Sequence, residues 1–309
     1  MPLESWEELI GEKIGPDERY TILRRVGEGG MGVVFEAIED SKNRSVAIKV
    51  LNSDGGSDAE TLSRFRREGS RFAKLRHPNI VRVYGMGRAR GMLYIASEFV
   101  DGVDLYHVMK KEGAIEIDRS LSIVEAAARG LAVAHANGVI HRDLKPENIM
   151  LTHVEQAVKV LDFGIAKDLN ASVALTVRGA YLGTPAYSAP EQIRGEEIDG
   201  RTDIFSLGVI LYELVTAETP FKGKRATEVL ANTIKVNPVN PTRINSEIEA
   251  PVARLIARMI HKKPRQRMSS CEDVIARITE VRAALRETVS EAEKKGVVGF
   301  LKGIFNSDS

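Results

Sequence analysis

The segment HRDLKPENIM, residues 141–150, gathers polar and charged side chains between two apolar stretches of the chain. Helix-like apolar sequence precedes it, and the short strand-like run AVKVLDFG follows it. A solvated loop is the simpler explanation. The alternative is a loop that carries out a reaction, because carboxylates, amines and amides can move protons, neutralise charge and hold metal ions. The neighbouring motifs decide between a solvated loop and a catalytic loop.

A second candidate is VGEGGMGVV, residues 26–34, in which Gly27, Gly29 and Gly32 form the pattern G-x-G-x-x-G. On its own this pattern is weak, because glycine-rich turns are common in hairpins. A dinucleotide-binding motif requires a helix directly after the glycines, whereas GVVFEAIE alternates like a strand. The sequence therefore predicts a glycine-rich β-hairpin whose backbone N–H groups can face phosphate oxygens.

Lys49 in VAIK is the cation expected beneath this hairpin. Side chains alternate along a strand, so Lys49 shares a face with Ala47, while Val46, Ile48 and Val50 take the other face. A lysine in this position can meet phosphates as a compact cation. The competing explanation is an edge-strand lysine in solvent.

Glu68 argues against a solvated lysine. It lies three residues after Phe65 and four before Phe72, spacings that put it on the buried face of a helix. A carboxylate in such a place needs a partner. The sequence therefore predicts an ion pair between Lys49 and Glu68.

The elements that position these residues fall into two classes along the chain. The first third is rich in short strands, and the chain after about residue 103 is mostly helical, with DIFSLGVILYELVTA expected as a buried helix. The sequence predicts an α+β fold of two lobes with a cleft between them, hinged near residues 98–102, where a ligand is expected. The strand candidates are YTILRRVG, GVVFEAIE, SVAIKV and LYIASEFVDG, and the other helix candidates are RSLSIVEAAARGLAVAHANG, APVARLIARMI and CEDVIARITEVRAALRETVSEAEKK.

Composition excludes several classes of protein. The 309 residues include 44 Lys and Arg and 43 Asp and Glu, so the net charge of +1 creates no strong field for nucleic acid or an anionic membrane. Cys271 is the single cysteine, which excludes an internal disulfide and fits a reducing compartment. The acidic N-terminus lacks the apolar core of a secretory signal, and no run reaches the about 20 apolar residues that span a membrane. We expect a cytoplasmic protein with no transmembrane segment and no nucleic-acid partner.

Five motifs together resemble the protein kinase family: GEGGMGVV, VAIK, HRDLKPEN, DFG and APE occur in this order. The resemblance covers about residues 20–284, and GEGGMGVVFEA is most similar to the eukaryotic-like (Hanks-type) serine/threonine kinases of bacteria. It implies a β-rich N-lobe with one regulatory helix over residues 20–97, a hinge at 98–102 and a larger helical C-lobe over 103–284. Residues 1–19 would then be an N-terminal extension, and residues 285–309 a C-terminal tail.

The resemblance also implies roles in phosphoryl transfer from ATP to Ser or Thr hydroxyls of protein substrates. Asp143 would orient the substrate hydroxyl and accept its proton, and Lys145 would stabilise the transferring phosphoryl group. Asn148 and Asp162 would hold Mg²⁺, or Mn²⁺ in its place. Thr184 would position the substrate. His141 is expected to be structural.

The nucleotide site would use the glycine hairpin, Lys49 on its strand, and backbone groups of the hinge. Glu68, on the helix, would hold Lys49 in place as a further catalytic residue. The residues expected to contact ATP are Val26, Gly27, Glu28, Gly29, Gly30, Met31, Gly32, Val33, Val34, Ala47, Lys49, Glu98 and Val100. Arg267 in KKPRQR is expected to pair with Glu191 of APE, in a structural role.

Regulation is expected in the segment between DFG and APE. Thr176 is the first candidate for autophosphorylation in trans, in a transient homodimer, and Ser172 the second. A phosphate adds a charge of about −1.5 to −2, which Arg142 beside the catalytic Asp143 could receive.

Two alternative functions, and the role of the C-terminal tail, remain open at this point. A pseudokinase scaffold would usually lack Lys49, Asp143 or Asp162, and a small-molecule kinase would lack the complete segment from Asp162 to Glu191. The tail GVVGFLKGIFNSDS is short and amphipathic, so it could pack on the helical lobe, remain disordered, or contact a membrane surface or a partner.

Overall fold

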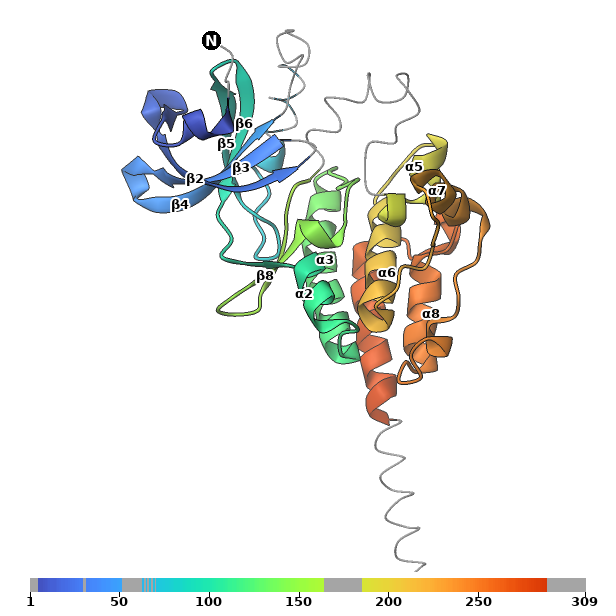
Figure 1. Cartoon of the computed structure of the whole chain (residues 1–309). Coiled ribbons are helices and arrows are strands. Elements are labelled where there is room, and N and C mark those ends of the chain that lie inside the picture. The colour runs from blue at the N-terminus through green and yellow to red at the C-terminus, as the bar shows by residue number, and fades with distance from the viewer. Residues whose placement is uncertain are drawn as a thin grey trace, which may run out of the picture. The chain divides into compact units, whose positions relative to one another are not determined.

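The computed structural model describes residues 5–29, 32–51, 63, 65, 67, 69, 71–163 and 185–287. The chain divides into two compact units, one comprising Met1–Val108 and Gly130–Pro185, the other Met109–Arg129 and Ala186–Ser309. The first holds every strand found among the described residues and is called the β-rich unit here; the second is the helical unit. The strands lie in the blue-to-green part of the chain (Figure 1).

A six-stranded antiparallel sheet forms the core of the β-rich unit, in the order β1-β2-β3-β4-β6-β5. The strong apolar alternation of β3 and β4 turns one face inward, where Phe35, Val46 and Ile48 are fully buried. The expected strands are thereby confirmed. The strands are β1 (Lys13–Ile14), β2 (Tyr20–Gly29), β3 (Gly32–Glu39), β4 (Arg44–Leu51), β5 (Val83–Ala89) and β6 (Met92–Glu98), with short 3-10 turns η1 (Trp6–Leu9), η2 (Pro16–Glu18) and η3 (Asp40–Lys42).

Residues 5–14 extend this sheet. Ser5 caps η1, accepting a hydrogen bond from the N–H of Glu7, and Leu9 is buried in the same apolar core as Phe35. β1 then pairs with the start of β2. The extension before residue 20 therefore covers the end of the sheet through η1 and β1.

A second, three-stranded sheet carries the loop of residues 141–148. It consists of β7 (Gly102–Asp104), β8 (Ile149–Thr152) and β9 (Val158–Val160), and η4 (Pro146–Asn148) leads directly into β8. A parallel bridge between Ile80 and Val160 ties β9 to the segment before β5. Between β7 and β8 the chain forms α2 (Leu105–Glu112) and α3 (Ile117–Ala136), and α3 stops shortly before Gly138 at φ +71°, as its sequence predicts.

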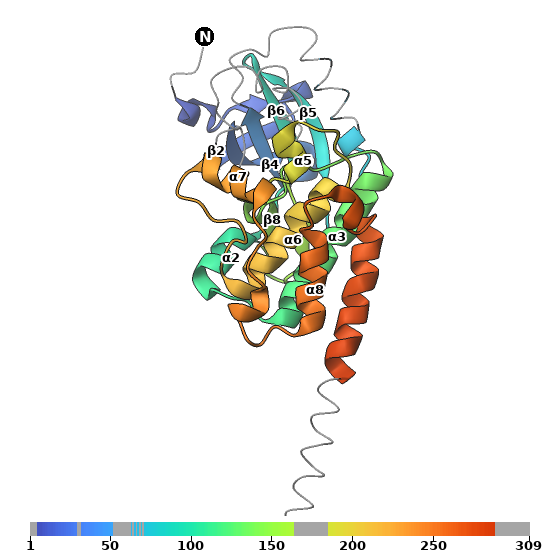
Figure 2. The same cartoon turned by 90° about the vertical axis from the view of Figure 1, so that its right-hand side faces the viewer.

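The helical unit is built around α6 (Arg201–Thr216), which is buried along almost its whole length, as its continuous apolar sequence predicts. α6 packs against α8 (Ala250–Met259), as both views show (Figure 1, Figure 2). The remaining elements are η5 (Pro185–Tyr187), α5 (Pro190–Arg194), α7 (Ala226–Lys235), η6 (Pro241–Arg243), η7 (Pro264–Gln266) and a helix over residues 271–287.

Within the described ranges, no helix has both the length and the apolar composition needed to cross a membrane.

Glu39, the last residue of β3, is a carboxylate with no exposed side-chain surface that is surrounded by cations. Arg19 donates from Nε at 2.9 Å, Arg44 from its Nε at 2.5 Å, and Lys42 Nζ lies 3.1 Å away. Burial by itself would raise the pKa of Glu39, but the hydrogen bonds from Arg19, Lys42 and Arg44 outweigh it and lower the pKa from 4.5 to about 2. The cluster therefore ties the end of β3 to the segments before β2 and at the start of β4.

We expect Glu39→Gln to lower the free energy of unfolding at pH 7 by about 2–4 kcal/mol, because the cations lose a buried partner. The pKa of Glu39 is lower in the folded chain than its ordinary 4.5, so its contribution is complete above about pH 4.5 and is lost as the pH falls toward 2. Urea unfolding at several pH values measures both effects. Asp40→Asn, which removes the exposed pair with Lys13, is the control and should cost less than about 1 kcal/mol. A wild-type–Glu39→Gln difference that stays constant from pH 7 to pH 3 would contradict the assignment.

Candidate active site

Lys49 lies on the face of β4 opposite the core, where Val46, Ile48 and Val50 are buried as the alternation predicts. Its Nζ is 2.8 Å from Oδ2 of Asp162, a residue 113 positions later in the chain. The Lys49 side chain is 18% exposed and that of Asp162 45% exposed, so the ammonium is sheltered while the carboxylate still reaches solvent. This pair brings two of the five motifs, VAIK and DFG, into direct contact.

The partner expected for Lys49 was Glu68, which lies outside the described residues, so that pairing stays a prediction. Sequence reasoning missed the pair with Asp162, because no local pattern connects positions so far apart. The order of the two motifs along the chain was the only available signal.

His141 anchors the loop of residues 141–148. It is fully buried, and one ring nitrogen, Nε2, lies 2.7 Å from the carbonyl oxygen of Leu161. The backbone N–H of Asp143 donates to Nδ1 at 3.3 Å. Nδ1 is therefore the acceptor and Nε2 carries the proton. The neutral His141 ring thus connects its own loop with Leu161, the residue before Asp162. This agrees with the structural role expected for it.

Asn148 links the same loop to β9. Its side-chain Nδ2 donates to the backbone carbonyl oxygen of Asp143 at 2.8 Å. The backbone carbonyl oxygen of Asn148 accepts from the N–H of Leu161, also at 2.8 Å. With Nδ2 committed, the side-chain Oδ1 is the atom that remains to bind a cation. The chain thus holds Asp143, Asn148 and Asp162 in one bonded framework.

Phe163 completes this framework from the other side. It is buried, with its ring centroid 4.7 Å from that of His141 and 5.5 Å from that of Phe72. Phe72 belongs to the helical segment in which Glu68 was expected on the buried face. These tilted ring contacts therefore connect that segment with the loop that carries Asp143, a connection that the sequence alone did not predict.

The glycine hairpin is formed by β2 and β3, paired from Gly27 with Val34 to Gly29 with Gly32. At Gly32, φ is +147° and a Cβ atom would lie 2.0 Å from the backbone oxygen of Val50, so the fold itself requires glycine there. At Gly27 and Gly29 a Cβ would meet nothing within 4 Å, and neither has a positive φ. Packing does not explain these two glycines, whereas the close approach of a phosphate to the backbone would.

We expect Gly29→Ala to leave the free energy of unfolding unchanged within about 0.5 kcal/mol and to raise the KM for ATP severalfold, because the methyl group would occupy the space predicted for the nucleotide. Gly32→Ala should instead destabilise the chain by more than about 2 kcal/mol, because it collides with backbone. Thermal unfolding and ATP titrations of both variants provide the measurement. Similar effects of the two substitutions would refute the distinction.

Glu98 at the end of β6 was expected to offer a backbone contact to adenine. Its N–H donates to the carbonyl oxygen of Arg82 at 2.8 Å, so a ligand contact at this residue has to come from its own carbonyl. Its side chain pairs with Lys159 at 2.6 Å, which fixes the strand end against β9. Val100 lies two residues beyond the end of β6, outside any strand.

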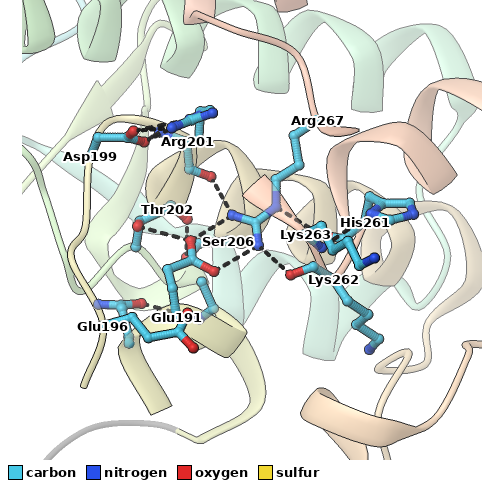
Figure 3. Close-up of polar contacts among 12 residues, drawn as sticks. Glu191, Glu196, Asp199, Arg201, Thr202, Ser206, His261, Lys262, Lys263 and Arg267 are labelled. Atoms are coloured by element: carbon cyan, nitrogen blue, oxygen red, sulfur yellow. Dashed lines mark hydrogen bonds and ion pairs between the residues drawn. The ribbon is translucent and has the colours of Figure 1, made fainter. Parts of the chain in front are cut away.

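In the helical unit, the pair expected between Arg267 and Glu191 is confirmed (Figure 3). The guanidinium donates to the two carboxylate oxygens at 2.6 and 2.7 Å, and both side chains are essentially buried. Thr202 donates to the same carboxylate at 3.0 Å. This bidentate pair, with the hydrogen bonds to Thr202 and to the carbonyl of Arg201, holds the APE segment on α6.

Several predicted site residues cannot be placed. Those that lie outside the described residues are Gly30, Met31, Glu68, Ser172, Thr176 and Thr184.

Comparison with known proteins agrees with these observations. The sequence-family model of the protein kinase domain matches residues 20–278 of this chain. The chain is 40% identical over 284 residues to the serine/threonine-protein kinase pkn3 of Myxococcus xanthus, covering 89% of this chain and 52% of that protein. It is 37% identical over 269 residues to PknB of Mycobacterium tuberculosis, covering 85% of this chain and 43% of that protein. The crystal structure of the Mycobacterium tuberculosis PknI kinase domain superposes with a TM-score of 0.70 at 28% identity, covering 88% of this chain and 99% of that one.

The chain therefore belongs to the protein kinase family, and its named relatives include bacterial serine/threonine kinases. The predicted family and fold are confirmed. The chain spans about half the length, or less, of the curated relatives it matches, with shares of 41%, 52% and 40% for three of them.

Proposed function

We propose that this chain is a serine/threonine protein kinase that transfers the γ-phosphate of ATP to Ser and Thr hydroxyls of protein substrates. The observation that carries the proposal is the contact of Lys49 with Asp162, at 2.8 Å, beside a loop in which Asn148 is bonded to Asp143. All four residues belong to the same compact unit. Phosphoryl transfer depends mainly on positioning and charge neutralisation, and this set of groups supplies both.

The donor set fits a Mg²⁺ ion, or Mn²⁺ in its place. Asn148 has Oδ1 available, and the Asp162 carboxylate is partly exposed, with one oxygen bonded to Lys49. Mg²⁺ in nucleotide sites is commonly bound by one or two protein oxygens together with phosphates, which these two side chains can supply. When bound, the ion supplies charge neutralisation on the phosphates. Lys49 then fixes the position of the Asp162 carboxylate and of phosphate oxygens.

Asp143 is proposed as the residue that orients the substrate hydroxyl and takes up its proton. Its backbone is fixed from two directions, through its N–H by His141 and through its carbonyl by Asn148. Lys145, two residues later, is proposed to stabilise the transferring phosphoryl group. Thr184 is proposed to position the substrate, together with Asp143 and Lys145.

The direct test is incubation with Mg²⁺, labelled ATP and a general protein substrate such as casein, followed by identification of the phosphorylated residue. We expect phosphoserine and phosphothreonine. ATP binding without turnover would support the scaffold alternative, and transfer only to small molecules would support the small-molecule kinase. Phosphotyrosine as the main product would overturn the proposed specificity.

Activation is proposed to follow autophosphorylation in trans, chiefly at Thr176 and secondarily at Ser172, in a transient homodimer. Arg142 supports this proposal: it is half-buried, with φ +64°, directly before Asp143, so a phosphate bound there would act on the catalytic loop.

We expect Thr176→Ala to lower the rate of substrate phosphorylation severalfold after preincubation with ATP, with a smaller effect for Ser172→Ala. Phosphosite mapping and steady-state kinetics provide the measurement, and a rate of autophosphorylation that rises with protein concentration supports transfer in trans. If Thr176→Ala retains full activity after preincubation, the switch lies elsewhere.

The cellular location and the role in signalling are also part of the proposal. Signalling by phosphorylation of proteins in the cytoplasm fits the use of ATP and the single, buried Cys271. Residues 288–309 lie outside the described residues, so packing of the tail and its contact with a membrane surface both remain hypotheses.

A further inference from the structure

The helical unit contains a cavity of about 560 Å³ along one side of α8. Its apolar wall is made by Tyr212 of α6, Val239 and Pro241 from the segment after α7, and Ala253, Ile256 and Ile260. The volume is within the about 300–1,000 Å³ typical of small-molecule sites. All lining residues belong to the helical unit, whereas Lys49 and Asp143 belong to the β-rich unit.

The charged residues that line this cavity are all basic. Arg254, His261 and Lys262 line it, and no Asp or Glu does. In Figure 3 the carbonyl of Lys262 faces Arg267 while its side chain extends away from that guanidinium. The Lys262 ammonium lies 3.4 Å from the centroid of the Phe221 ring and donates to the carbonyl oxygen of Thr233 at 2.6 Å.

Lys262 is unusual because no carboxylate among the described residues neutralises it. Burial, with a smaller contribution from the nearby Arg267 and Arg194, lowers the pKa of Lys262 to about 7. An ammonium has three donor hydrogens, and the single carbonyl of Thr233 accepts only one of them. An anion at this position would satisfy the remaining donors and restore the charged form.

His261 offers a second donor. The N–H of Lys263 donates to its Nδ1 at 3.1 Å, so Nε2 is the nitrogen that carries the proton in the neutral ring. Arg254 is exposed on α8, one turn before Arg258, and adds positive charge along the same side. The cavity thus combines an apolar wall with a cationic rim.

We propose that this cavity binds a small amphiphilic anion. Its apolar body would lie against Tyr212, Ile256 and Ile260, and its single carboxylate or phosphate group would accept hydrogen bonds from Lys262 and His261. Charge complementarity selects an anionic head, since a neutral one leaves Lys262 uncompensated and a cationic one is repelled. The limited volume selects one small molecule over a folded segment of a protein.

The test compares ligands that share one apolar chain and differ in the head group: decanoate, decyl phosphate, decanol and decyltrimethylammonium, each below its micelle concentration. Calorimetric titration of the full 309-residue chain should show at least one of the two anions binding about tenfold or more tightly than decanol, the gain expected from charged hydrogen bonds. The ammonium ligand should bind most weakly. The ratio of decanoate to decyl phosphate identifies the preferred anion.

Three variants locate the binding. Lys262→Met should abolish the preference for the anion while decanol binding is retained, and Lys263→Met, at the exposed neighbour that does not line the cavity, should leave it unchanged. Ala257→Trp places an indole into the cavity from an exposed position, so it should block all four ligands without unfolding the chain. Equal affinity for decanol and both anions, no detectable binding of any ligand, or undiminished binding to Ala257→Trp would overturn the proposal.

Discussion

Asp143→Asn is expected to lower kcat by about 10² to 10⁴ while the affinity for ATP changes less than about twofold. The substitution keeps the shape of the side chain and removes its charge and its ability to accept a proton. The backbone of Asp143 is held by His141 and Asn148, so the loop should keep its position in the variant. Initial rates with a protein substrate give kcat, and the nucleotide-induced rise in Tm reports ATP binding.

The surface variant Asp40→Asn is a suitable control for Asp143→Asn, since it removes a carboxylate that pairs with Lys13 at the far end of the sheet. It should show wild-type kinetics. Turnover near the wild-type level in Asp143→Asn would remove Asp143 from the mechanism. A parallel loss of ATP binding would instead indicate that the loop had been disturbed.

The second large effect is expected at Asp162. Asp162→Asn should raise the Mg²⁺ concentration needed for half-maximal activity more than about 100-fold, because the only charged ligand proposed for the ion is lost. It also removes the ion pair with Lys49, whose Nζ is 2.8 Å from Oδ2. Catalysis at saturating Mg²⁺ should therefore remain depressed.

Lys49→Met separates the two functions of Asp162. It removes the cation and keeps the proposed metal ligand, so activity should fall while the dependence on Mg²⁺ stays close to that of the wild type. Metal titrations of the activity of both variants provide the comparison. If Asp162→Asn shows the wild-type dependence on Mg²⁺, the metal assignment is wrong.

The sequence predicted the elements well where one local pattern dominated. In β4 the alternation alone identified the buried side, Val46, Ile48 and Val50, and therefore the side that carries Lys49. The continuous apolar run of α6 likewise predicted a helix buried on all sides. Such predictions succeed because the period of a strand or helix fixes the direction of each side chain from its neighbours alone.

The five ordered motifs went further than periodicity and identified the family. They also predicted the distant pair of Arg267 and Glu191, which the structure confirms. That pair came from resemblance and not from spacing, since 76 positions separate its members.

By itself, then, the sequence determined four strands of the six-stranded sheet, the four main helices, the order of the motifs and the types of groups available for chemistry. Only the tertiary structure decided which groups meet: Lys49 with Asp162, the neutral His141 between Leu161 and Asp143, and the unneutralised Lys262 beside an apolar cavity. The physical reason is that local periodicity sets the direction of a side chain, whereas its partner depends on the path of the chain between distant segments. Pairing, burial and pKa all depend on that path.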